Sequence, residues 1–134
     1  MNTPAWGSSP SAFFSLPTLF QAIVEQSPAA LIVADRQGLI RCWNPRASEL
    51  FGYTADEAQG QSLDIIIPEH LRAPHWAGYE QAMQSGGTRH GGQLTVTRAT
   101  NKAGGKVYVE VSFSLLKAED GSIAGALAMG FPKR

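Results

Sequence analysis

The sequence of 134 residues is poor in features that mark several large protein classes. Its single cysteine, Cys42, excludes an internal disulfide and a zinc site built from cysteines, and it indicates a reducing compartment. The longest mostly apolar runs, at residues 29–34 and 123–131, are far shorter than the roughly 20 residues of a membrane-spanning helix. The N-terminus lacks a basic region followed by a continuous apolar stretch. A soluble cytoplasmic protein without membrane contact is therefore expected.

Charge and motifs exclude further functions. Eleven Lys and Arg balance eleven Asp and Glu, so no broad basic field attracts phosphate backbones, and direct nucleic-acid binding is not expected. No nucleophile with a neighbouring base, no phosphate-binding loop and no repeated pair of carboxylates is present. We therefore expect a protein that is not an enzyme. Because no kinase, cyclase or DNA-binding segment follows residue 131, the expected output passes to a partner.

The length fits one domain with a flexible start. Residues 1–15 are rich in Ser, Pro and Gly, which is typical of a flexible arm. Residues 16–27 predict a short amphipathic helix that stops before Pro28. Its apolar positions are Leu19, Phe20, Ile23 and Val24. The folded domain is expected over residues 28–131, with a tail at 132–134.

The rest of the sequence predicts strands at both ends and helices between them. Asp35 to Gly38 has the composition of a hairpin turn, and Asn44 is suited to cap a helix at 45–51 that Gly52 ends. Thr54 and Glu57 form a capping box for another short helix, followed by one turn at 62–67. The longest helix is expected at 68–85, and the strands at 30–34, 39–43, 92–100, 106–116 and 122–131.

Five segments of the sequence together resemble the signature of a known family. They are Leu31-Ile32-Val33-Ala34-Asp35-Arg36-Gln37-Gly38-Leu39-Ile40, Trp43-Asn44-Pro45-Arg46-Ala47, Leu50-Phe51-Gly52-Tyr53, Asp56-Glu57-Ala58-Gln59-Gly60 and Asn101-Lys102-Ala103-Gly104. Over about residues 20–131 the chain resembles a PAS domain. The resemblance implies an α+β fold with a five-stranded antiparallel sheet in the order 2-1-5-4-3. Short helices and one longer helix cover one face, the amphipathic helix precedes them, and a pocket lies between helix and sheet.

The cofactors of this family can be compared with the residues present. Flavin-binding light sensors and chromophore-binding yellow proteins of the family carry a reactive cysteine in the pocket. Cys42 is the only cysteine, and it lies on an expected strand, where burial as a small side chain explains it. Flavin is therefore not the expected cofactor.

Heme b is the cofactor that the resemblance favours. Residues 68–104 resemble the oxygen-sensing heme PAS domains of FixL-type histidine kinases, and His75 falls on the position of their axial iron ligand. A neutral imidazole is a common axial donor to heme iron. On the expected helix one face combines His75 with small and apolar residues that would let a flat ring approach, namely Leu71, Gly78, Tyr79 and Ala82.

The other expected contacts show where the chain departs from that group. The resemblance places Val111 and Phe113 over the opposite side of the ring, and it places Arg89, with His90 beside it, near the propionates. Gln81 stands where a second propionate contact is expected. Thr95 takes the place of the arginine that contacts bound oxygen, so Gln93 or Arg98 would have to supply a donor. Otherwise the site favours carbon monoxide or nitric oxide.

Two alternatives to a heme sensor remain open. The chain could be a cofactor-free interaction module whose N-terminal helix packs against a second copy or a signalling protein. The pocket could instead bind a small organic molecule. In each case a homodimer and an unidentified signalling partner are expected.

Overall fold

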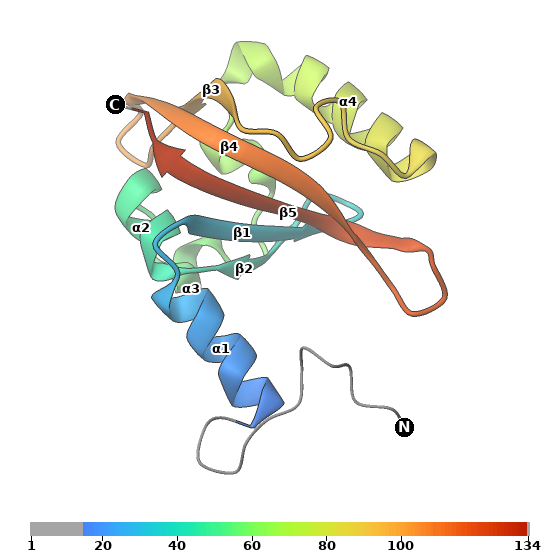
Figure 1. Ribbon diagram of the computed structural model, residues 1–134. Coiled ribbons are helices and arrows are strands. Elements are labelled where there is room, and N and C mark those ends of the chain that lie inside the picture. The colour runs from blue at the N-terminus through green and yellow to red at the C-terminus, as the bar shows by residue number, and fades with distance from the viewer. Residues whose placement is uncertain (1–14, 134) are drawn as a thin grey trace.

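A computed structural model describes residues 15–133 (Figure 1). The chain order is helix, two strands, a group of short helices, one longer helix and three strands. The elements are α1 (Leu16–Gln26), β1 (Ala30–Asp35), β2 (Ile40–Trp43), α2 (Pro45–Phe51), α3 (Ala55–Ala58), the 3₁₀ turns η2 (Leu63–Ile66) and η3 (Glu69–Leu71), α4 (Arg72–Ser85), β3 (Thr95–Thr100), β4 (Lys106–Lys117) and β5 (Ile123–Pro132). In this part of the chain no helix is long and apolar enough to cross a membrane.

The five strands form one antiparallel sheet in the order β2-β1-β5-β4-β3, which confirms the expected topology. The β1–β2 hairpin and the β3–β4–β5 meander therefore meet through β1 and β5, whose pairing joins the start of the domain to its end. In Figure 1, α4 runs beside β3 and β4, whereas α1 points away from the sheet.

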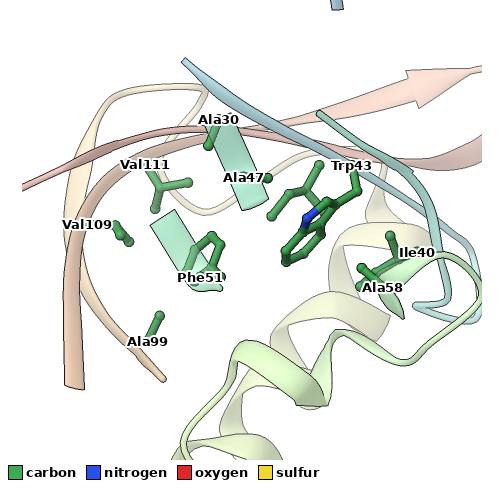
Figure 2. Packing of buried hydrophobic residues seen from close by; sticks show 10 residues of the cluster. Ala30, Ile40, Trp43, Ala47, Phe51, Ala58, Ala99, Val109 and Val111 are labelled. Carbon is green, nitrogen blue, oxygen red and sulfur yellow. The ribbon is translucent and has the colours of Figure 1, made fainter. Parts of the chain in front are cut away.

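The core lies between one face of the sheet and the short helices (Figure 2). Alternate residues of β4, Val109 and Val111, are buried on this face, and Ala47 and Phe51 of α2 pack against it. Trp43 is 5% exposed, yet its indole nitrogen donates to Ser48 Oγ and to the carbonyl of Tyr53, both at 3.1 Å. The ring is therefore buried without an unpaired polar atom.

Asn44 is the most heavily bonded polar side chain of the core. Its Oδ1 accepts from the backbone N–H of Ala47, the predicted helix cap, and from that of Leu31. Its Nδ2 donates to the carbonyls of Val24 and Ala29. One side chain at 2% exposure thus joins α2, β1 and the last turn of α1. The sequence predicts the cap but gives no signal for the other three bonds.

Two predicted element starts are wrong. The longest helix begins at Arg72, not at residue 68, because the residues before it close a separate 3₁₀ turn in which Leu71 N–H donates to the carbonyl of Pro68 at 2.8 Å. The third strand begins at Thr95, not at 92, because Gly91 and Gly92 have φ values of +59° and +84°, which a β-strand does not accommodate. The arm predicted for residues 1–15 lies almost wholly outside the described residues.

Candidate functional site

Helix α4 is attached to the β1–β2 turn by two aromatic side chains. The Tyr79 hydroxyl donates to the carbonyl of Asp35 at 2.6 Å, and burial raises the pKa of this phenol to about 12. The six-membered ring of Trp76 lies so close to Gly38 that a Cβ atom there would overlap it. Gly38 also has a φ of +80°, so it serves both the turn and the packing of the helix.

His75 lies between these two anchored rings. Its imidazole meets the Trp76 ring edge to face, with centroids 4.7 Å apart and planes at 75°. The Tyr79 ring lies 5.8 Å away at 35°. Both rings belong to α4 itself, and each is tied to the β1–β2 hairpin, so the imidazole packs against rings of its own helix that the hairpin anchors.

The imidazole is half-buried, neutral and incompletely bonded. Burial lowers the pKa of His75, and the nearby carboxylate of Asp64 opposes that effect without reversing it. The neutral form is therefore favoured at neutral pH, which is the form that donates to metals. The Nδ1 atom is buried and has no hydrogen-bond partner among residues 15–133. Such an atom costs about 1–3 kcal/mol unless a ligand satisfies it.

The residues expected beside His75 are only partly brought together. Gly78 and Ala82 lie on the flank of α4 next to His75, and a Cβ at Gly78 would have no atom within 4 Å, so this flank is open. Leu71 ends η3 and is the N-cap residue of α4, so it lies at the start of the helix and not within it, and its place on the face of His75 stays a prediction.

On the sheet, Thr95 pairs with Val111, so the two side chains share one face. Val111 is 6% exposed within the core, whereas Phe113, next on this face of β4, is 40% exposed. Arg98 pairs with Tyr108, on alternate positions to Val109 and Val111. Its side chain therefore leaves from the opposite face, and it cannot supply the missing donor to this site.

The remaining expected contacts lie at the surface. Gln81 is exposed on α4, and Arg89 and His90 are exposed in the segment between α4 and β3. Gln93, in the same segment, is held through its backbone N–H, which donates to the carbonyl of His90 at 3.1 Å. Arg89, with His90 beside it, is thus available to an anionic ligand.

Two surface hollows are present near the candidate elements. One, of about 310 Å³, lies between α4 and the β1–β2 turn and is lined by Arg36, Gln37, Trp76, Tyr79, Glu80, Met83 and Gln84. The other, of about 520 Å³, lies between α2 and the β3–β4 turn and is lined by Glu49, Leu50, Phe51, Gly52, Asn101, Lys102 and Ala103. Neither of these two hollows is lined by His75.

One contact of the site was missed by the sequence reasoning. The Trp76 indole N–H donates to Asp64 Oδ1 at 2.7 Å, which links η2 to α4 beside His75. The available signal was a single acidic residue inside the otherwise apolar run Leu63 to Ile67. An acid in such a run needs a partner, although the sequence does not say which one.

Comparisons with known proteins agree with this architecture. A protein family described as PAS fold matches residues 18–131. A PAS domain structure from Colwellia psychrerythraea has a TM-score of 0.76 at 20% identity and covers 89% of this chain and 98% of its own. A light-oxygen-voltage protein of Rhodobacter sphaeroides has a TM-score of 0.66 at 16% identity and covers 87% and 67%. At these identities the likeness shows the fold alone.

Two curated sensors are similar in sequence. The oxygen sensor protein DosP of Escherichia coli is 26% identical over 101 residues, which are 75% of this chain and 13% of DosP. The sensor protein FixL of Bradyrhizobium diazoefficiens is 38% identical over 58 residues, which are 43% of this chain and 12% of FixL. The chain therefore spans about an eighth of the length of each of these relatives.

Proposed function

The chain belongs to the PAS family, and we propose that it is a sensor module without catalytic activity that holds heme b through His75 and passes its state to a signalling partner. The observation that carries this proposal is the neutral, half-buried imidazole whose buried Nδ1 has no partner among the described residues. A lone imidazole supplies one ligand, and a porphyrin brings the four equatorial nitrogens itself.

The residues around His75 fit such a group on the helix side. Gly78 leaves the flank of α4 open, and the sheet offers the apolar Phe113, which is 40% exposed, whereas Val111 is packed in the core. Arg89 is free to pair with a propionate. When bound, heme supplies an iron atom with one position open to a gas. Thr95 offers a hydroxyl in place of a cation, so the site favours carbon monoxide or nitric oxide over oxygen.

Hemin titration of the purified full chain tests this proposal. We expect a Soret band that saturates at one heme per chain and that His75→Ala weakens or shifts. His70→Ala is the matched control, because His70 is exposed one turn earlier and should leave the spectrum unchanged. A colourless wild type in excess hemin, or a His75→Ala spectrum identical to that of wild type, contradicts heme ligation by His75.

A second candidate is a homodimeric interaction module, favoured by the outer face of the sheet. Residues on this face alternate with the core positions and include large side chains that are 38–55% exposed: Val96, Tyr108, Leu116, Met129 and Phe131. Large exposed apolar side chains gathered on one sheet face favour a protein–protein contact, and here Glu110 is the charged residue that lies between Val96 and Phe131.

Light scattering on the full chain tests the second candidate. We expect Phe131→Glu to shift a dimer to monomer, because burying a carboxylate in an apolar interface is unfavourable. Leu94→Glu is the control, since Leu94 is 54% exposed but lies outside the sheet. A wild type that is monomeric at high concentration rules out homodimerisation through this face.

A further inference from the structure

We propose that Asp64 is a positioning residue for His75: its carboxylate holds the Trp76 indole, which fixes the plane of the imidazole, and its negative charge strengthens the imidazole as a ligand. This inference rests on the proposed binding of heme by His75. It adds a residue from η2, outside the helix that carries His75, to the site.

The carboxylate is presented by a fixed backbone. The Asp64 N–H donates to Ser62 Oγ at 3.1 Å, and the Asp64 carbonyl accepts from the N–H of Ile67 at 3.1 Å. The guanidinium of Arg72, at the start of α4, also donates to this carbonyl at 3.3 Å. Residues before and after η2 therefore hydrogen-bond to the backbone of Asp64, whose side chain accepts from Trp76.

The indole transmits this placement to His75. Trp76 is held at its N–H by Asp64 Oδ1 and at its six-membered ring by contact with Gly38. A ring held at both ends has little freedom to rotate, so the edge-to-face contact with His75 at 4.7 Å restricts the imidazole as well. Metal-ligating imidazoles commonly depend on such supporting groups for their orientation.

The charge of Asp64 acts on the same ring. Asp64 Oδ1 lies 2.7 Å from the Trp76 indole nitrogen, and the Trp76 and His75 ring centroids are 4.7 Å apart, so the fold places a carboxylate near the imidazole. Arg72 Nε lies 3.9 Å from Oδ1 and offsets only part of this charge, because both side chains are about 40% exposed to water. A negative charge near a ligating imidazole favours the more highly charged ferric iron over ferrous iron.

Two substitutions in the full chain separate the hydrogen bond that holds the Trp76 indole from the effect of the negative charge of Asp64. Asp64→Asn keeps an oxygen that accepts from the Trp76 indole but removes the charge, so we expect the midpoint potential of bound heme to become more positive. Trp76→Phe keeps a ring but removes the indole N–H, and we expect about 10-fold weaker hemin affinity with a changed Soret position. Glu69→Gln, at an exposed acid in η3, is the control and should change neither value.

The outcomes distinguish the positioning role of Asp64 from the binding of heme by His75. Circular dichroism of each variant first establishes that the fold is retained. If wild type binds heme through His75 while Asp64→Asn and Trp76→Phe both keep its potential, affinity and spectrum, Asp64 has no positioning role and the proposed function stands. If wild type takes up no heme, both proposals fail together.

Discussion

The surroundings of Asn44 and of His75 are opposite solutions to placing a polar side chain inside a PAS fold. Asn44 is 2% exposed, and both of its polar atoms are fully used in four hydrogen bonds to three elements. His75 is half-buried, and its buried Nδ1 has no partner within residues 15–133. Around Asn44 lies the main core cluster, whereas Met83 is the one residue of α4 that is fully buried.

This difference in hydrogen bonding distinguishes the region around Asn44, which acts as a scaffold, from the candidate site around His75. A polar side chain with every bond made stabilises one arrangement and has nothing to offer a ligand. A side chain with an unmet bond, on a helix that buries little of itself, lies in a part of the molecule that opens at lower free energy. The region around Asn44 therefore stabilises the fold, and the proposed ligand would bind at α4, beside the unpaired Nδ1 of His75.

The largest expected effect is at the scaffold. Asn44→Ala leaves the N–H groups of Leu31 and Ala47 and the carbonyls of Val24 and Ala29 without their partner, and we expect a loss of about 4 kcal/mol in the free energy of unfolding. Chemical denaturation measures it. Asn44→Asp should lose at least as much as Asn44→Ala, because the buried carboxylate would turn an oxygen toward the carbonyls of Val24 and Ala29. An alanine variant that loses less than about 1 kcal/mol would show that water replaces these bonds.

The second largest loss in the free energy of unfolding is expected at the contact between Gly38 in the β1–β2 turn and Trp76 on α4. Gly38→Ala must overlap the Trp76 ring and adopt a positive φ, and we expect a loss of about 2–3 kcal/mol. Gly60→Ala is the matched control, because Gly60 has a φ of +81° but no atom within 4 Å of its added Cβ. The excess of Gly38→Ala over this control measures the contact with α4. Equal losses for Gly38→Ala and Gly60→Ala would mean that α4 moves away from the added Cβ at little cost in free energy.

A smaller effect is expected at the hydroxyl that ties α4 to β1. Tyr79→Phe removes the bond to the carbonyl of Asp35 and should lower the free energy of unfolding by about 1 kcal/mol. Hydrogen exchange should increase in α4 more than in β1. Tyr53→Phe is the comparison, since the Tyr53 hydroxyl is 3.4 Å from the carbonyl of Ile65 and contributes less. A larger loss at Tyr53 would reverse this order of strengths.

The smallest expected effect is a pH dependence from His75. Its folded pKa lies below the unfolded value, because burial disfavours the charged ring. The unfolded chain therefore binds the proton first as pH falls below about 6.5, and stability falls with it until the folded pKa is passed. One proton limits the slope to about 1.4 kcal/mol per pH unit, and water around the half-exposed ring keeps it lower.

Unfolding curves measured from pH 7.5 to 5 check this expectation. His75→Asn should remove the slope that wild type shows in this range, and His70→Asn should retain it. A slope that persists in His75→Asn would assign the titration to another group. It would also remove the evidence that the imidazole is held neutral by its surroundings.

The sequence by itself determined the local structure of the scaffold. The Asn44 cap, the capping box of Thr54 and Glu57 and the hairpin turn at Asp35 to Gly38 are confirmed, because each depends on residues close together in the chain. The alternation of Val109 and Val111 identified the core face for the same reason. The PAS sheet order followed from the resemblance that these segments carry.

Only the tertiary structure decided what surrounds His75. The sequence placed this residue on the longest helix beside Trp76 and Tyr79, but the groups that anchor those two rings come from η2 and the β1–β2 hairpin, which lie 11 and about 40 residues from His75 along the chain. The packing of the elements decides which donor and acceptor pair across such distances along the chain. The local sequence pattern does not predict these pairs. For this reason the contacts of Asp64 and Gly38 with Trp76 could be found only in the folded chain.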